Sequence, residues 1–162
     1  MDNREIKKIV ETVVSTITSH KETKMTLSLA KNLAEIVEKK ASEIGVNAVV
    51  AVSDSGANTV LVECMDDSYI ASYDIAKNKA FTVVSLKMPT SHLKKLAAPG
   101  GSLYGIQFTN EGKIVIFGGG VPLKVNGKVI GGLGISGGSE EQDTYLAEYG
   151  EKVFDELIKN IR

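Results

Sequence analysis

The chain of 162 residues, 43% hydrophobic and 24% charged, has the size and composition of one soluble globular domain. Its formal net charge of -1 leaves no basic footprint for nucleic acid, and its apolar runs are too short to span a bilayer. A single cysteine, Cys64, excludes an intramolecular disulfide and a multi-cysteine zinc site. The N-terminus lacks the long apolar segment of a signal peptide, so the composition predicts a cytoplasmic protein.

The first segment, residues 1–22, is expected to be a helix followed by a polar linker. Apolar residues recur at helical spacing through its first part and form one stripe. Thr26 is a suitable N-cap for a second helix that ends near Gly45. We expect residues 23–162 to form a single domain.

Two hairpins are predicted further along the chain. Turn formers separate the apolar runs 48–52 and 59–63. The runs 121–125 and 129–136 meet across Asn-Gly, the strongest short hairpin signal. A fifth strand is expected over Lys113–Phe117.

Helices fill the segments between and after the hairpins. Asp67 or Ser68 is expected to cap a helix that Pro89 limits, and a short helix follows that proline. Ser139 and Gln142 form a capping-box pattern at the start of the last helix. Because the strands come in hairpin-linked groups and do not alternate singly with helices, the order predicts an α+β domain with an antiparallel sheet.

Nine of the sixteen glycines fall between Phe117 and Gly138. Glycine loses more backbone freedom on folding than any other residue, so this density indicates positive φ or a close approach of the backbone to another group. Gly132–Gly137 matches G-x-G-x-x-G, but its glycines begin inside a strand and no second parallel strand follows. Close packing of a strand is therefore favoured over a dinucleotide site.

The helix start at Gly137-Gly138-Ser139 has two interpretations. Free N–H groups and the helix dipole favour an anion or the edge of a cofactor at this position. Three acidic residues in the first turn already complement the dipole, and they favour a plain cap.

Among other residues with ligand chemistry, His92 is expected on the surface and Cys64 as a buried apolar residue. His20 is either a solvated linker residue or an axial haem ligand. The sequence has no zinc signature, nucleophile elbow or Ser/His/Asp set. The residues alone therefore do not support an enzyme.

Taken together, motifs spread over about residues 27–158 resemble the GlcG/HbpS/PduO C-terminal-domain family, described as haem-binding or haem-degrading, and its PduO-like branch above all. The matching segments, in chain order, are Val52–Gly56, Met65–Ser68, Ile75–Ala80, Pro99–Ile106, Ile114–Leu123 and Gly137–Asp143.

The resemblance implies a profilin-like fold: a central antiparallel five-stranded sheet flanked by helices. It implies a homo-oligomer such as an octamer. It also implies haem as the ligand, with cobalamin or another corrinoid as the alternative. The associated roles are glycolate or diol metabolism, propanediol utilisation included, or redox sensing, and the associated location extends to a bacterial microcompartment. Adenosyltransferase activity is not expected, because the chain resembles only the C-terminal domain.

Three functions are left as alternatives. The first is a small-molecule-binding accessory protein in which His20 ligates haem iron and Thr90 and Tyr104 offer hydroxyls. Its ligand would lie against the backbone of five glycines: Gly118, Gly119, Gly120, Gly137 and Gly138. The second is an assembly protein whose glycine strands make the subunit contact. The third is an enzyme on a small oxygenated metabolite, with Asp143 or Lys79 as its acid or base.

Overall fold

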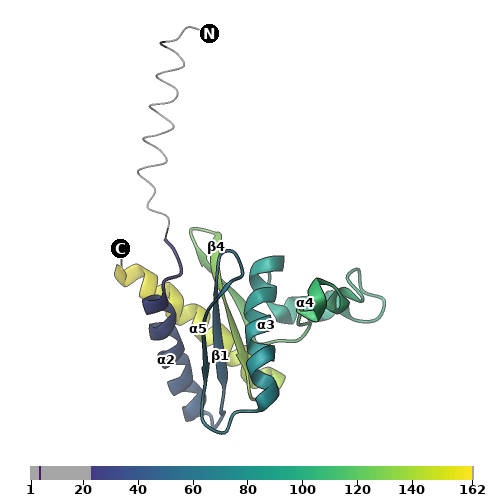
Figure 1. Cartoon of the computed structure of the whole chain (residues 1–162), viewed down its shortest axis with the longest axis horizontal. Helices are drawn as coiled ribbons and strands as arrows, with labels where there is room; N and C mark the ends of the chain where they lie inside the picture. The colour runs from purple at the N-terminus through teal and green to yellow at the C-terminus, as the bar shows by residue number, and fades with distance from the viewer. Residues whose placement is uncertain (1–3, 5–22, 162) are drawn as a thin grey trace.

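The computed structural model describes residues 4 and 23–161, and these residues form an α+β domain (Figure 1). The helices are α2 (Leu27–Glu43), α3 (Ile70–Leu86), α4 (Thr90–Ala97) and α5 (Glu140–Ile161), with the 3-10 turns η1 (Ile106–Phe108) and η2 (Asn110–Gly112). The strands are β1 (Val49–Asp54), β2 (Thr59–Cys64), β3 (Gly120–Val125) and β4 (Lys128–Ser136). The helix and linker predicted over residues 1–22 fall almost entirely outside the described residues.

The sheet has the strand order β2-β1-β4-β3, and each neighbouring pair is antiparallel. Two local hairpins, β1–β2 and β3–β4, supply the outer pairs. At the centre β1 pairs with β4, so that Val49 lies opposite Ser136. The second hairpin turns at Asn126 and Gly127, whose φ values are 51° and 77°. The Asn-Gly hairpin, the α+β class and the antiparallel sheet are therefore confirmed.

The prediction of a five-stranded sheet is wrong, because the described part of the chain has four strands. The missing strand is Lys113–Phe117. There the N–H of Val115 donates to Oγ1 of Thr82, on α3, at 3.0 Å. The Val115 N–H is thus bonded to a helix side chain where a strand would bond to the backbone of its neighbour. Ile114 is buried, but the segment around it is a connection and not a strand. The profilin-like description stays a prediction.

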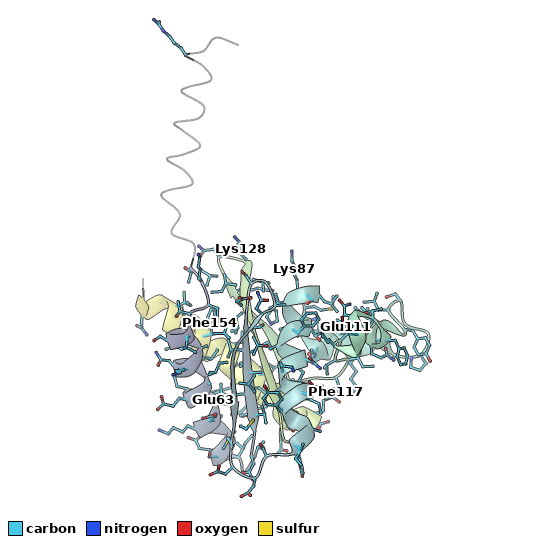
Figure 2. The ribbon with its side chains drawn as sticks, viewed as in Figure 1. Glu63, Lys87, Glu111, Phe117, Lys128 and Phe154 are labelled. Carbon is cyan, nitrogen blue, oxygen red and sulfur yellow. The ribbon has the colours of Figure 1, made fainter. Side chains whose placement is uncertain are left out.

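The two faces of the sheet are covered differently. Helices α2 and α5 pack on one face and α3 on the other (Figure 1). The α2–α5 face holds the larger apolar core, which includes the fully buried Phe154 near the place where α5 passes α2 (Figure 2). On the α3 face, Val49 and Ala51 of β1 pack against Ala76 and Ala80. Small side chains therefore bring α3 close to the sheet.

Of the three predicted helix caps, two are confirmed and one is wrong, and α4 begins directly after Pro89 as expected. Oγ1 of Thr26 accepts from the N–H of Leu29 at 3.2 Å, as expected for the N-cap of α2. A reciprocal pair of hydrogen bonds between residues 139 and 142 forms the predicted capping box of α5. Neither Asp67 nor Ser68 caps α3: the N-cap position is Tyr69, with no side-chain hydrogen bond.

Helix α4 and the turns after it form a lobe, residues 90–113, that projects beyond α3 (Figure 1). Tyr104 and Phe108 of this lobe are 67% and 82% exposed. Across the described ranges, none of the helices has the length and apolar character needed to cross a bilayer.

Candidate functional site

A hollow of about 340 Å³ lies where β4 ends, between the first turns of α3 and α5; we call it the α3–α5 groove. Phe117 reaches it from the connection that precedes β3, and Figure 2 shows this side chain beside α3. The groove is lined by Tyr69, Ala71, Ser72, Ile75, Phe117, Ser136, Gly137, Gly138, Glu140 and Asp143. Its wall, from α3 and Phe117, is apolar. Its floor is polar and consists of Ser72, Ser136, Glu140 and Asp143.

A second hollow of about 440 Å³ adjoins the groove and shares Tyr69, Gly137 and Gly138 with it. We call it the polar hollow, since its remaining lining is mostly polar: Gly45, Val46, Asn47, Asp67, Ser139 and Gln142. The two hollows therefore open on either side of the same glycine turn.

The glycine turn at Gly137 and Gly138 is required by space. The φ of Gly137 is +150°, and a Cβ there would lie 2.4 Å from the backbone oxygen of Asn47. The next N–H, from Gly138, donates to Oδ1 of Asp143 at 2.9 Å. The turn thus sets the end of β4 against the first turn of α5 and fixes Asp143 at the floor of the groove.

A buried ion pair lies under this floor. Nζ of Lys79, on α3, is 3.0 Å from Oδ2 of Asp143, and the two side chains are 0% and 5% exposed. The same ammonium donates to the backbone oxygen of Ile135 at 2.6 Å. It also lies 4.8 Å from the centre of the Phe117 ring. Lys79 therefore ties α3 to β4, to α5 and to the wall of the groove.

Burial and pairing act in opposite directions on the pKa values of this pair. Burial lowers the pKa of the Lys79 ammonium, and the neighbouring Asp143 carboxylate opposes that shift. Burial likewise raises the pKa of Asp143, while Lys79 and the Gly138 N–H act to lower it. Each group therefore depends on the other to stay charged away from water.

At the groove mouth, Glu140 is paired with a different lysine. Its Oε2 lies 2.5 Å from Nζ of Lys94, on α4, and its Oε1 accepts from the N–H of Gly118 at 2.9 Å. Lys94 and this N–H hold the pKa of Glu140 below its usual 4.5. The carboxylate thus fastens α4 and the glycine loop to the start of α5.

Comparison with known proteins identifies the family. The model of the family described as "Haem degrading protein HbpS-like" matches residues 25–152. The chain belongs to the HbpS-like family.

Several relatives of known sequence or structure support this membership. An uncharacterized 15.0 kDa protein from the dhaT-dhaS intergenic region of Citrobacter freundii is 50% identical over 82% of this chain and 94% of its own length. The corrinoid adenosyltransferase PduO of the same organism is 36% identical over 90% of this chain, but the match spans only 45% of PduO. The predicted resemblance to PduO-like proteins is confirmed.

Solved structures agree with the fold of the chain. Protein ORFY of Klebsiella pneumoniae is 44% identical, with a TM-score of 0.80 over 84% of this chain and 94% of its own. A structure described as a PduOC:heme complex is 35% identical, with a TM-score of 0.77 over 80% of this chain and 94% of its own. HbpS of Streptomyces reticuli, as a double mutant, is 30% identical, with a TM-score of 0.75 over 83% and 89%.

Most glycines of this HbpS-like chain serve packing. A Cβ at Gly134 would lie 2.1 Å from the backbone oxygen of Ala76, and one at Gly132 would lie 2.5 Å from that of Ala80. A Cβ at Gly119, whose φ is +111°, would lie 2.6 Å from Nζ of Lys79. The strand-packing interpretation of Gly132–Gly137 is thus supported, because these glycines let α3 lie directly on the sheet.

The structure brings together only some of the residues predicted to bind a ligand. Gly137 and Gly138 line both hollows. Gly118, Gly119 and Gly120 are buried and line neither hollow. Thr90 is fully buried and accepts from the Gly120 N–H at 2.9 Å, so its hydroxyl is occupied within the fold. Tyr104 lies on the projecting lobe, outside the lining of either hollow, and His20 lies outside the described residues.

Two further predictions concern single residues. His92 is exposed, as expected. Cys64 is also exposed, and the prediction that it is buried is wrong. The reason is that Cys64 ends β2, which is an edge strand in the described part of the chain and has a neighbouring strand on one flank only. Among the described residues, no group of three or more His, Cys, Asp or Glu side chains is placed to hold a metal ion.

The helix start at Gly137-Gly138-Ser139 has the hydrogen bonds of a cap. The Gly138 N–H is taken by Asp143, and the Ser139 and Gln142 N–H groups are taken by the capping box. These three donors are satisfied within the chain, which favours the cap; the alternative of an anion or a cofactor edge at this position stays a prediction.

Sequence reasoning missed the side chains that form most of the groove: Tyr69, Ser72, Ile75, Phe117, Ser136 and Glu140. Phe117 carried the best available signal, because it is an aromatic residue at the edge of a glycine run. Lys79 and Asp143, considered as an acid or base, do lie together. Lys79 has no exposed surface, however, so of the two only Asp143 faces the groove.

Proposed function

We propose that this protein is an accessory protein that binds a flat tetrapyrrole, haem in the first place and a corrinoid as the alternative, in the α3–α5 groove. Membership of a family described as haem-degrading and the haem complex of the PduOC relative support this proposal. We place the protein in the cytoplasm, in the context of diol or glycolate metabolism, with association with a microcompartment as part of the proposal. Redox sensing is the other role considered.

The observation that carries the proposal is the groove wall. Tyr69, Ile75 and Phe117 present apolar side chains beside the side-chain-free turn at Gly137 and Gly138, and a flat ring packs best on such a surface. The described lining contains neither histidine nor cysteine. The wall therefore fits the ring, while an axial iron ligand has to come from elsewhere in the chain. His20 stays the proposed ligand. Bound haem would supply an iron centre and a Soret absorbance band.

A haem titration of the full-length protein tests the proposal. We expect a saturable Soret shift at about one haem per chain that His20→Ala weakens and changes in position, since an axial ligand is lost. Phe117→Ala should weaken binding roughly tenfold, because it removes aromatic contact area from the wall. Phe108→Ala, on the projecting lobe, is the matched control and should bind as the unaltered protein does.

Three outcomes would count against this function. A shift that never saturates would reject a haem site, and the same titration with cobalamin would then test the corrinoid. An unchanged spectrum in His20→Ala would remove His20 from the site. Equal losses in Phe108→Ala and Phe117→Ala would indicate adsorption to exposed aromatic residues.

Assembly into a homo-oligomer is a second proposal, which a separate observation favours. Tyr69, Ile70 and Tyr73, at the start of α3, are 72%, 98% and 49% exposed. Such a cluster on a small domain is typical of a contact surface. We expect light scattering to give a multiple of the 17.3 kDa chain mass, and Ile70→Ser to lower that mass. A monomer at all concentrations would reject the proposal, the octamer included.

A further inference from the structure

We propose that the floor of the α3–α5 groove binds a small, uncharged molecule with several hydroxyl groups, a polyol. This rests on the proposed function only in taking the groove as the ligand site, and not on the identity of a tetrapyrrole. The floor consists of Ser72, Ser136, Glu140 and Asp143.

The charge of the floor selects an uncharged ligand. Each carboxylate is already paired, Asp143 with Lys79 and Glu140 with Lys94, so the floor carries no net charge. Neither lysine lines the groove: Lys79 is fully buried, and the exposed Lys94 reaches Glu140 from α4. An anionic ligand would therefore meet carboxylate oxygens first, at a cost that no cation in the lining offsets.

The hydrogen-bonding capacity of the floor selects a hydroxyl group. Ser72 and Ser136 are 3% and 5% exposed, and their Oγ atoms are 3.0 Å apart in a hydrogen bond. Whichever serine donates in this bond, the pair keeps one proton to give to a third group. The oxygens of Asp143 accept from Lys79, from the Gly138 N–H and from the Gly137 N–H; a carboxylate has about four acceptor sites, so the group retains capacity for a further bond.

A ligand that satisfies this floor has to donate and accept at neighbouring atoms. An alcohol does both, whereas an ammonium only donates and a carboxylate only accepts. More than one hydroxyl is needed, because the serine pair and Asp143 offer separate partners. The adjoining Ala71 and Ile75 give an apolar wall for the C–H face of such a molecule.

Three probes of matched size separate these requirements: glycerol, its acid glycerate, and 1-propanol. We would titrate each into the ¹⁵N-labelled full-length chain and follow the backbone amides by NMR. Glycerol should give saturable shifts confined to the groove, with the largest at Gly137 and Gly138, which line it. Glycerate should bind roughly tenfold more weakly or worse, because the carboxylates of the floor repel its charge. 1-Propanol should lose a similar factor, because it lacks the further hydroxyl groups that make hydrogen bonds.

Variants then test the floor itself. Ser72→Ala and Ser136→Ala should each weaken glycerol binding roughly tenfold, the effect of about one hydrogen bond. Ser85→Ala is the matched control, since Ser85 is an exposed serine near the other end of α3. The dispersion of the same spectra reports whether each variant is folded.

The proposal would be overturned by glycerol shifts that do not saturate or that spread over the surface. Equal affinity for glycerate, or unchanged affinity in both serine variants, would overturn it as well. The Soret titration is an independent readout. Glycerol binding without haem binding would reject only the tetrapyrrole, and haem binding without glycerol binding would reject only the polyol.

Discussion

The two faces of the sheet solve the same packing problem in different ways. On the α2–α5 face, large side chains such as Phe154 and Leu133 fill the space between helix and sheet. On the α3 face, glycines bring backbone against backbone, and the buried Lys79–Asp143 pair lies beside an apolar cluster of only a few small side chains. The first face can adjust by moving side chains, whereas the second has little freedom. A rigid face is the better support for a ligand groove.

The largest loss of folding stability is expected when the buried Lys79–Asp143 pair is broken. Lys79→Met keeps the aliphatic stem but leaves Asp143 as an uncompensated buried carboxylate. We expect the free energy of unfolding to fall by about 3–5 kcal/mol, measured by urea denaturation. The surface pair Lys159–Glu156 gives the control, and Lys159→Met should leave the stability close to that of the unaltered protein, because solvent screens this exposed pair.

The double variant Lys79→Met with Asp143→Leu sharpens this result. It removes both charges together, so most of the lost stability should return. If the double variant were as unstable as the sum of the two single variants, the two residues would not act as a pair.

The next largest loss of stability is expected from adding a Cβ at a glycine, and one glycine from each face is compared. In Gly134→Ala the new Cβ would lie 2.1 Å from the Ala76 backbone oxygen, and backbone cannot move aside locally. We expect thermal and urea unfolding to show a loss of about 3 kcal/mol. In Gly150→Ala the nearest atom is Cδ2 of Leu133, the end of a flexible side chain, at 2.3 Å. The gain in helix propensity, about 1 kcal/mol, should offset much of that crowding. Similar losses in both variants would contradict the contrast between the faces.

The smallest effect is a dependence on pH at the groove mouth. The pKa of Glu140 in the folded protein lies below its usual 4.5, so its ionised form favours folding. This contribution is complete above about pH 4.5 and is lost as the pH falls through the lowered pKa. The stability advantage over Glu140→Gln should therefore reach up to about 1 kcal/mol near neutral pH and shrink in acid. A difference that grew below pH 4.5 would contradict this assignment.

Features fixed by neighbouring residues could be predicted from the sequence. The Asn126-Gly127 turn needs positive φ, which these two residue types tolerate, and the Ser139–Gln142 cap needs only a three-residue spacing. The strand over Lys113–Phe117 could not be excluded in this way. Its competitor for hydrogen bonds, Thr82, precedes Val115 by 33 residues.

The groove was harder to predict because it assembles distant segments. Lys79 and Asp143 are 64 residues apart, and nothing local pairs them. One signal was present: Lys79 is a charged residue within the apolar stripe of α3, between Ala76 and Val83. A charge at such a position needs a buried partner. The sequence pattern of Cys64 offered no comparable signal, because periodicity does not distinguish an edge strand from a central one.

The pairing of β1 with β4 has a consequence for how the chain acquires its structure during synthesis. The central register sets Val49 opposite Ser136, so the middle of the sheet joins an early segment to a late one. The β1–β2 hairpin can form as soon as it leaves the ribosome, but its partner strand is made only after most of the chain has emerged. Until then the apolar face of β1 has neither β4 nor α5 to cover it. Nascent chains stalled before residue 128 should therefore be the ones that most need protection from aggregation.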